Sequence, residues 1–220
     1  MLNISELDVA IGSVAILRGV TLELPTGRIA GLIGRNGAGK TTLMRSIMGL
    51  LRPSAGLLEL DGVNLRELPP YRRAHAGLGY MPEDRKLIPE LTVEENILAP
   101  AWATGQRNGG ERLQKIYAMI PELQPLAARK ALQLSGGQQK LAALGRALMC
   151  GSKLLLLDEP FEGVAPVLSK RIAEVVAMLK HEGLSMIVSE SDLQHSTRML
   201  DIVFRIERGV VTGMPAGQTR

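Results

Sequence analysis

The sequence has little cysteine and few aromatic residues. Cys150 is the only cysteine among 220 residues, so an internal disulfide is excluded and we expect a reducing, cytoplasmic environment. Aromatic residues make up 3% of the chain, which leaves few surfaces on which nucleic-acid bases could stack. The net charge is only +4, and the lysines and arginines are scattered. We therefore expect no nucleic-acid partner.

Long hydrophobic runs are also absent. The apolar run Leu154–Leu157 is far shorter than the roughly 20 residues that a membrane-spanning helix requires. Residues Met1–Glu6 lack the basic and then apolar layout of a signal peptide, so we expect none. A hydrophobic content of 45% nevertheless allows a sizeable buried core, and we expect residues 1–220 to form a single domain.

Glycine is plentiful, and the chain is organised around one glycine-rich stretch. An apolar run over Arg28–Ile33 predicts a buried strand before it, and helical spacing over Thr41–Leu50 predicts a helix after it. Strand, glycine-rich loop and helix in this order are typical of a P-loop, which binds the phosphates of a nucleoside triphosphate. The expected binding residues are Gly34, Arg35, Asn36, Gly37, Ala38, Gly39, Lys40, Thr41 and Thr42.

The residue types within this loop suit phosphate chemistry. Glycines at 34, 37 and 39 permit backbone angles that turn successive N–H groups toward an anion, and the helix N-terminus adds partial positive charge. We expect Lys40 to reach the β- and γ-phosphates and the Thr41 hydroxyl to bind Mg²⁺. The alternative is a glycine turn without a ligand, which the complete G-x-x-x-x-G-K-T pattern disfavours.

Two acidic residues follow the apolar run Leu154–Leu157. A buried strand that ends in adjacent carboxylates is electrostatically costly unless a cation is bound there. With a P-loop upstream, we expect Asp158 to hold Mg²⁺ and Glu159 to orient or deprotonate an attacking water molecule. Without the P-loop, a simple strand end that meets solvent would explain both acids.

A pair of glycines marks the start of another predicted helix. Ser135 and Gln138 have the spacing of an N-terminal capping box, which explains these two residues without a ligand. Gly136 and Gly137, however, each cost helix stability of about 1 kcal/mol. They would allow backbone N–H groups at the helix N-terminus to approach an anion.

Periodicity predicts an α/β fold with an antiparallel β N-terminal part and an inserted α-helical subdomain. Alternating residues over Leu2–Val9 and Val20–Leu24 predict half-buried strands. A helical period from 83 to about 150 predicts the subdomain, between core segments 1–82 and 151–220. The other predictions are strands at Leu57–Leu60, Leu78–Met81, Lys153–Leu157, Leu184–Val188 and Ile202–Ile206, helices at Glu111–Ile120, Pro166–Glu182 and Asp192–Leu200, and a strand end with a loose tail over Gly209–Arg220.

The order of the motifs resembles that of the ABC-type ATPases. In that family a Walker A loop, an L-S-G-G-Q signature and a Walker B strand ending in D-E-P follow one another as they do here. Within the family, Met81–Arg85, Leu91–Asn96 and Gly163–Pro166 are similar to the ATP-binding subunits of branched-chain amino acid importers. The resemblance implies a P-loop NTPase core of the RecA-like type that binds ATP and Mg²⁺.

The resemblance also implies partners. Each ATP would lie between the P-loop of one subunit and Ser135–Gln138 of a second ABC ATPase subunit, identical or related. The helical subdomain and the loop at Glu83 would take the coupling helices of integral membrane permease subunits, which receive solute from a solute-binding protein. The implied location is peripheral, on the cytoplasmic face of the inner (plasma) membrane.

The sequence departs from the family pattern at four positions. Ile11 occupies the place of an aromatic residue that stacks on adenine. Glu83 replaces a glutamine near Mg²⁺, and Ala165 replaces an aspartate, both as in the branched-chain relatives. Ser191 (or Glu190, if the alignment slips by one) stands where a histidine would contact the γ-phosphate. Serine can donate one hydrogen bond there but cannot become cationic.

Two functions fit these residues. The first is an ATP-hydrolysing motor subunit of an importer, which the complete Walker A and Walker B motifs favour. The second is an ATP-binding subunit with little or no hydrolysis, which clamps a heterodimer with a better-equipped relative and is favoured by Ser191 and Ile11. His195, one turn beyond Ser191, is expected to be a surface residue without a role.

The aliphatic residue at position 11 predicts weak discrimination between bases. Ile11 can cover a purine, but the aromatic stacking that contributes about 1–3 kcal/mol in other base-binding sites would be missing. We expect GTP to compete with ATP for the site in an equilibrium competition assay. A strong preference for ATP over GTP would contradict this prediction.

Overall fold

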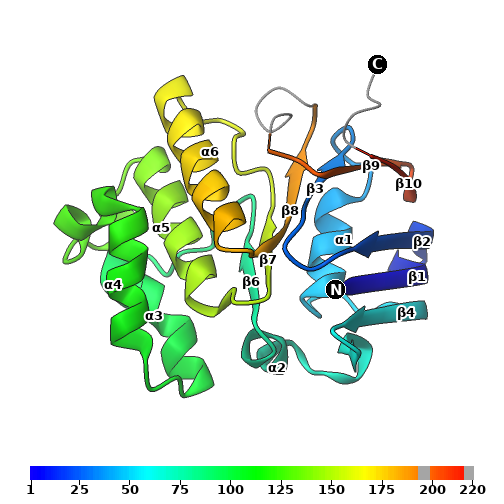
Figure 1. The fold of residues 1–220 in the computed structure, drawn as a ribbon, viewed down its shortest axis with the longest axis horizontal. Helices are drawn as coiled ribbons and strands as arrows, with labels where there is room; N and C mark the ends of the chain where they lie inside the picture. The colour runs from blue at the N-terminus through cyan, green and yellow to red at the C-terminus, as the bar shows by residue number, and fades with distance from the viewer. Residues whose placement is uncertain (193–198, 216–220) are drawn as a thin grey trace.

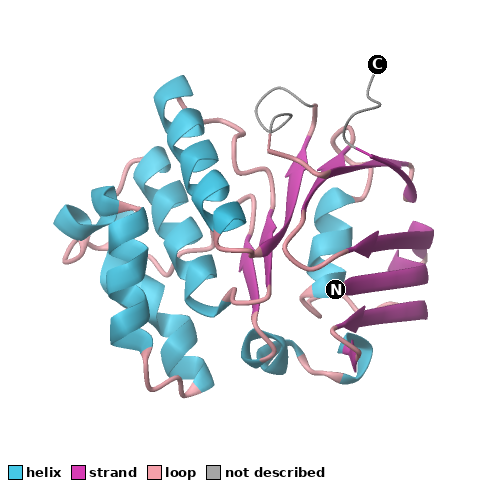
Figure 2. Ribbon diagram, viewed as in Figure 1, coloured by secondary structure: helices cyan, strands magenta, loops and turns pink. Residues whose placement is uncertain are grey.

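The structure is a computed structural model that describes residues 1–192 and 199–215 (Figure 1). Most helices lie at one end of the molecule and the small sheet at the other, with the strands of the large sheet between them (Figure 2). The strands are β1 (Leu2–Ile11), β2 (Val14–Leu24), β3 (Ile29–Ile33), β4 (Ala55–Leu60), β5 (Val63–Asn64), β6 (Leu78–Met81), β7 (Leu154–Leu157), β8 (Ser185–Glu190), β9 (Ile202–Glu207) and β10 (Val210–Pro215).

Six α-helices lie in the described part of the chain, with three short 3₁₀ segments. The α-helices are α1 (Lys40–Ile47), α2 (Pro70–His75), α3 (Val93–Thr104), α4 (Gly109–Met119), α5 (Gly136–Cys150) and α6 (Pro166–His181). The 3₁₀ segments are Leu65–Glu67, Pro121–Leu126 and Ala131–Gln133. Within residues 1–192 and 199–215, none of the helices combines the length and the apolar character that crossing a bilayer requires.

The smaller sheet is antiparallel, with strand order β2-β1-β4-β5. In β1 the buried residues alternate with exposed ones, first at Leu2 and Ile4 and then at Leu7 and Val9. The pairing register shifts between Ile4 and Leu7, where Glu6 has a positive φ of 48°. This bulge moves the apolar residues by one position, so both pairs face the core. The antiparallel N-terminal part is confirmed.

The larger sheet has the order β10-β9-β3-β8-β7-β6, and all its strands run parallel except β10. β3 and β7 are buried along their whole length, as near-continuous apolar runs require when both faces of a parallel sheet are covered. The α/β fold class predicted from the sequence is therefore confirmed.

α1 lies between the two sheets (Figure 1). Its apolar residues Leu43, Met44 and Ile47 are fully buried against the small sheet and one face of the large sheet. β7 supplies Leu154 and Leu156 to this face, because side chains alternate across a strand.

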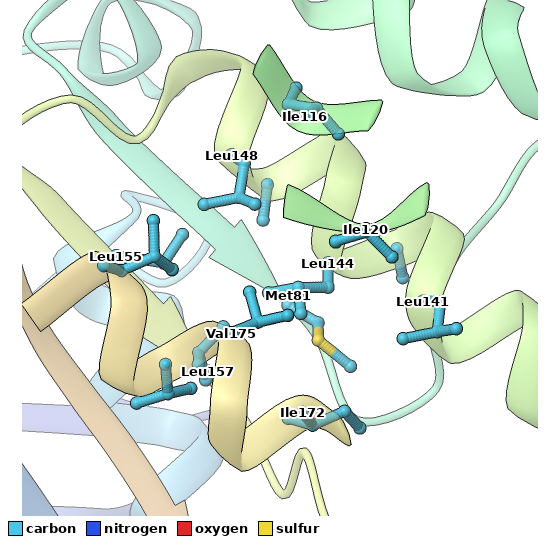
Figure 3. Packing of buried hydrophobic residues seen from close by; sticks show 14 of the residues in the cluster. Met81, Ile116, Ile120, Leu141, Leu144, Leu148, Leu155, Leu157, Ile172 and Val175 are labelled. Atoms are coloured by element: carbon cyan, nitrogen blue, oxygen red, sulfur yellow. The ribbon is translucent and has the colours of Figure 1, made fainter. Parts of the chain in front are cut away.

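The opposite face of the large sheet is covered by α3, α4, α5 and α6. Leu155 and Leu157 of β7 pack there with Met81 of β6 (Figure 3). The helices contribute apolar stripes such as Leu144 on α5 and Val175 on α6, which the same close-up shows converging on these strand residues. The core therefore has two apolar clusters, one on each face of the parallel sheet.

The helix starts follow local signals that the sequence displays. At α3 the N–H of Glu95 donates to Thr92 Oγ1 at 3.1 Å, and the N–H of Thr92 donates to Glu95 Oε2 at 2.8 Å. At α5 Gln138 and Ser135 form the same reciprocal pair, at 3.4 and 3.0 Å. The capping box predicted at Ser135 is confirmed, and each of the two boxes satisfies two otherwise unpaired N–H groups.

The C-terminal segment extends the predicted strand end, and residues 216–220 of the predicted loose tail lie outside the described residues. β10 is a full strand that pairs with β9, because Arg208 and Gly209 have φ values of 48° and 80°, as the two central residues of a hairpin turn require. α2 and β5 were not predicted. The predicted helix at Asp192–Leu200 falls mainly on residues 193–198, which lie outside the described residues.

Because β6 packs closely against α5, a side chain at Gly79 should destabilise the fold. A Cβ at Gly79 would lie 2.2 Å from the carbonyl oxygen of Ala147 and 2.8 Å from Cα of Gly151, so backbone would have to move. We expect Gly79→Ala to lower the free energy of unfolding by about 1–3 kcal/mol in urea titrations.

The matched control is Gly110→Ala in the first turn of α4. A Cβ at Gly110 would meet no atom within 4 Å, so this change should leave stability unchanged or raise it by up to about 1 kcal/mol. Equal midpoints for the two variants would show that the contact at Gly79 is not tight.

Candidate active site

The candidate site lies where three strands of the large sheet end together. β8 lies between β3 and β7, and all three run parallel, so their carboxyl ends share one edge of the sheet. Ile33 pairs with Glu190, and the N–H of Gly34 donates to the carbonyl of Glu190 at 3.2 Å. The P-loop, the acidic pair after β7 and residues 189–191 are therefore neighbours, although they are distant in the sequence.

Backbone geometry and close packing both require the P-loop glycines. Gly39 is the N-cap of α1 with a φ of 115°, a conformation that residues with side chains rarely adopt. A Cβ at Gly34 would lie 2.3 Å from the carbonyl oxygen of Ile206 on β9. The β9–β10 turn supports the loop as well, since the N–H of Gly209 donates to the carbonyl of Ala38 at 3.0 Å. The loop is thus fixed directly before a helix N-terminus, where an anion is stabilised.

A cleft of about 380 Å³ borders the P-loop. Ile11, the predicted base-binding residue, does not line it and is 49% exposed. Ile16 on β2 lines it instead, and no spacing in the sequence distinguished Ile16 from its neighbours. The lining residues are Ile16, Asn36, Gly37, Gly39, Lys40, Thr41, Thr42, Glu83 and Glu159.

Lys40 and Glu159 form a buried ion pair across this cleft. Lys40 Nζ lies 3.0 Å from Glu159 Oε1, and the two side chains are only 5% and 7% exposed. The ammonium group also donates to the carbonyls of Gly34 and Arg35. A buried charge pair is stable only when its remaining hydrogen-bonding groups are satisfied, and these carbonyls do so. The pair brings the predicted phosphate-binding lysine and the predicted base together on this cleft.

Three hydroxyl groups hold the carboxylate of Asp158. Its Oδ1 accepts from Ser189 Oγ at 2.8 Å and from Thr41 Oγ1 at 3.2 Å, and its Oδ2 accepts from Tyr80 OH at 3.1 Å. Burial and the neighbouring Asp158 charge raise the pKa of the Tyr80 phenol above its usual range. Tyr80 therefore stays a hydrogen-bond donor, and three neutral hydroxyl groups fix Asp158.

The oxygen atoms at this place suit a magnesium ion. Thr41 and Asp158 bring a hydroxyl and a carboxylate together, and Glu83 lines the P-loop cleft with Thr41. Burial raises the pKa of the Glu83 carboxyl, and the carboxylates of Glu162, Asp158 and Glu159 raise it further. This excess of negative charge on hard oxygen ligands fits Mg²⁺. When bound, the ion would neutralise charge on the phosphates.

Ser191 contacts the predicted base directly. Its Oγ donates to Glu159 Oε1 at 3.2 Å and to Asn36 Oδ1 at 3.0 Å. Ser191 thus contacts both the P-loop and Glu159, and its contact with a γ-phosphate stays a prediction. His195 lies outside the described residues.

The loop that carries Glu83 is held by α5. Arg85 and Lys86 both have positive φ, of 65° and 47°, and Arg146 of α5 donates to both of their carbonyls at 2.5 Å. Burial lowers the pKa of the Arg146 guanidinium, although an arginine remains charged in any such setting. The position of Glu83 therefore depends on α5.

Ser135–Gln138 do not line the cleft at the P-loop of the same chain. They form the start of α5, and Gly136 lines a different cleft with Glu83, Lys140 and Glu162. The structure therefore separates the signature motif from the Walker motifs of its own chain.

Four residues of this site were not predicted from the sequence: Ile16, Tyr80, Lys140 and Ser189. Ser189 follows the apolar residues Met186–Val188 in β8, and a hydroxyl in a wholly buried strand was the available signal. Lys140 was signalled by a charge on the apolar side of a predicted helix, and it is only 4% exposed.

A phosphate-binding loop, a hydroxyl and two carboxylates at the carboxyl edge of a parallel sheet define a P-loop NTPase. The family model described as ABC transporter matches residues 17–162, and the chain belongs to that family. It is therefore an ATP-binding subunit with ATPase activity.

Curated relatives cover nearly the whole chain. The chain is 32% identical to the high-affinity branched-chain amino acid transport ATP-binding protein BraG of Pseudomonas aeruginosa, over 95% of this chain and 90% of that protein. It is 31% identical to the lipopolysaccharide export system ATP-binding protein LptB of Haemophilus influenzae, over 91% and 85%.

Solved structures agree with the fold. A dimeric structure of a bacterial ABC transporter cassette is similar with a TM-score of 0.88 and 25% identity, over 98% of this chain and 99% of that one. A nucleotide-free ATP-binding cassette from an ABC transporter is similar with a TM-score of 0.85 and 28% identity, over 98% and 91%.

The raised pKa of Glu83 predicts a pH-dependent effect on stability. The pKa in the folded state lies above the usual value of 4.5, so the ionised carboxylate destabilises the fold, and stability is lost as pH rises through the folded pKa. In Mg²⁺-free buffer at neutral pH, we expect Glu83→Gln to raise the melting temperature by at most about 3 °C, because the side chain is largely exposed.

This gain should disappear as the pH falls below 4.5, where the wild-type carboxyl becomes neutral in both states. Glu90→Gln, an exposed glutamate outside this cleft, serves as the control and should show no such trend. A gain of equal size at pH 5 and pH 8 would contradict the assignment.

Proposed function

We propose that this chain is the ATP-hydrolysing motor subunit of an importer for branched-chain amino acids or a similar small organic solute. The observation that carries the hydrolytic part is the placement of Glu159, whose carboxylate contacts both Lys40 of the P-loop and Ser191. A carboxylate at the phosphate-binding loop is where a general base for water attack is needed.

The branched-chain part rests on relatives. Besides BraG, the chain is 30% identical to the probable branched-chain amino acid transport ATP-binding protein LivF of Archaeoglobus fulgidus, over 96% of this chain and 90% of that protein. The similarity to LptB, whose name concerns lipopolysaccharide export, comes at nearly the same identity. The solute is therefore the finer part of the proposal.

In the proposed reaction each residue has one role. The P-loop N–H groups and Lys40 bind the phosphates of ATP and reduce their charge. Thr41, Asp158 and Glu83 hold Mg²⁺, and Tyr80 keeps Asp158 in place. Glu159 orients or deprotonates the attacking water, and Ser191 donates a hydrogen bond to a phosphate oxygen. Ile16 replaces Ile11 as the residue that covers the base in our proposal.

Assembly supplies the parts that one chain lacks. Ser135–Gln138 do not line the cleft at the chain's own P-loop, which supports a head-to-tail dimer in which these residues contact the nucleotide of a second ABC ATPase subunit. The N-terminus of α5 would offer N–H groups and partial positive charge to the γ-phosphate.

A second cleft suits the membrane subunits. Residues from α1, α2, α3 and the Glu83 loop line it, so a coupling helix seated there would touch both the core and the predicted helical subdomain at about 83–150. Leu50, on the lining, is 51% exposed. Through such permease subunits the protein would lie on the cytoplasmic face of the inner membrane, served by a solute-binding protein.

The second candidate is an ATP-binding clamp with little or no hydrolysis, paired with a better-equipped relative. Ser191 favours it, because a neutral hydroxyl replaces a side chain that can become cationic at the γ-phosphate. The two candidates differ in one measurable property, the turnover that depends on Glu159.

The test is steady-state ATPase activity of the protein assembled with its membrane partners, compared with Glu159→Gln. We expect the variant to lose about 10²-fold or more in kcat, because glutamine cannot accept the proton of the attacking water. ATP binding should persist, since Lys40 is freed from its ion pair with Glu159.

If both proteins bind ATP and hydrolyse it at the same low rate, the second candidate function is correct, and hydrolysis belongs to another chain. Glu162→Gln, a neighbouring glutamate that does not line the P-loop cleft, is the matched control and should retain most of the activity.

A further inference from the structure

Glu159 has a backbone conformation that is unfavourable for its residue type. Its φ is 48°, in the left-handed region that residues with a side chain seldom occupy. The residue is also 5% exposed, so water does not satisfy its backbone groups. The N–H of Glu162 donates to the Glu159 carbonyl at 3.3 Å, and other elements add one contact at each end of the residue.

Ser189 of β8 holds the amide end. The N–H of Glu159 donates to Ser189 Oγ at 2.9 Å. The same hydroxyl donates to Asp158 Oδ1 at 2.8 Å, so the single donor and an acceptor site of this side chain are both used. Ser189 is completely buried. The contact therefore fixes the start of the acidic turn relative to β8.

Lys140 of α5 holds the carbonyl end. Its Nζ donates to the carbonyl of Glu159 at 2.9 Å and also to the carbonyl of Glu162. Lys140 is 4% exposed, and burial and the neighbouring Arg85 lower the pKa of its ammonium group, while the carboxylates of Glu162, Glu159 and Glu83 partly oppose this shift. A buried lysine bound to two backbone carbonyls is costly to maintain unless the position of those carbonyls matters.

We propose that Lys140 and Ser189 are positioning residues that clamp the backbone of Glu159 and so aim its carboxylate at the attacking water. The inference deepens the proposed function and rests on Glu159 being the general base. Lys140 lies in the second turn of α5, two residues after Gln138, so the clamp also ties the signature helix to the base of the same chain.

The first test measures the clamp without hydrolysis. In the nucleotide-free full-length chain, amide hydrogen exchange of the segment 158–162 is followed by mass spectrometry. We expect Ser189→Ala and Lys140→Met each to speed exchange there about 3- to 10-fold, as the loss of one hydrogen bond predicts. The controls Ser169→Ala, a buried serine on α6, and Lys115→Met, an exposed lysine on α4, should leave this segment unchanged.

The second test measures the consequence in the transporter assembled with its membrane partners. We expect Lys140→Met to lower kcat about 10-fold with KM for ATP nearly unchanged, because orientation and not binding is lost. Lys140→Gln keeps a neutral N–H donor and should restore part of the rate. Added to Glu159→Gln, Lys140→Met should have no further effect on single-turnover hydrolysis, since both act through one carboxylate.

Unchanged amide exchange in both Ser189→Ala and Lys140→Met overturns the proposed clamp on the Glu159 backbone. A further tenfold loss of single-turnover rate when Lys140→Met is added to Glu159→Gln also overturns it, because Lys140 would then act by a route that bypasses Glu159. If Lys140→Met speeds amide exchange of the segment 158–162 but keeps the full kcat, Lys140 does not position the base. If Glu159→Gln alone keeps full activity while exchange is faster in both variants, the clamp stands and the proposed hydrolytic function fails.

Discussion

The position of β8 between β3 and β7 is the constraint on which the site depends. Because the three strands are parallel and adjacent, the P-loop, the acidic turn and residues 189–191 meet at one edge. Each segment follows a buried strand, so none can shift without disturbing the core on both faces of the sheet. The Lys40–Glu159 ion pair joins two of these segments, and Ser191 contacts both of them from the third.

Burial decides how the charges at this edge are arranged. A charge taken out of water needs both a partner and full hydrogen bonding. Lys40 has Glu159 and two backbone carbonyls, whereas Asp158 is surrounded by hydroxyl groups of Thr41, Tyr80 and Ser189. Neutral donors hold Asp158 without neutralising its negative charge, so the carboxylate can still bind a metal ion.

α5 braces the loops around the site through cationic side chains. Lys140 binds carbonyls of the acidic turn, and Arg146 binds those of the loop that carries Glu83. Both loops contain residues with positive φ, and the cations add hydrogen bonds to their carbonyls; the carbonyl of Glu159 also accepts from the N–H of Glu162 at 3.3 Å. A movement of α5 would therefore alter both the proposed base and the proposed metal ligand.

The sequence alone determined the features that neighbouring residues encode. The P-loop glycines, the apolar strand before Asp158 and the capping boxes at Thr92 and Ser135 are contiguous patterns, and the structure contains each of them. Backbone conformation and local hydrogen bonding depend on a few consecutive residues, which is why such patterns are readable.

Only the tertiary structure decided the strand order, the pairing of β10, the presence of Ile16 instead of Ile11 in the cleft and the clamp on Glu159. Ser189 is 30 residues from Glu159, and Lys140 is 19 residues from it. No short-range rule links such positions, because their contact results from packing α5 and β8 against the same strand end.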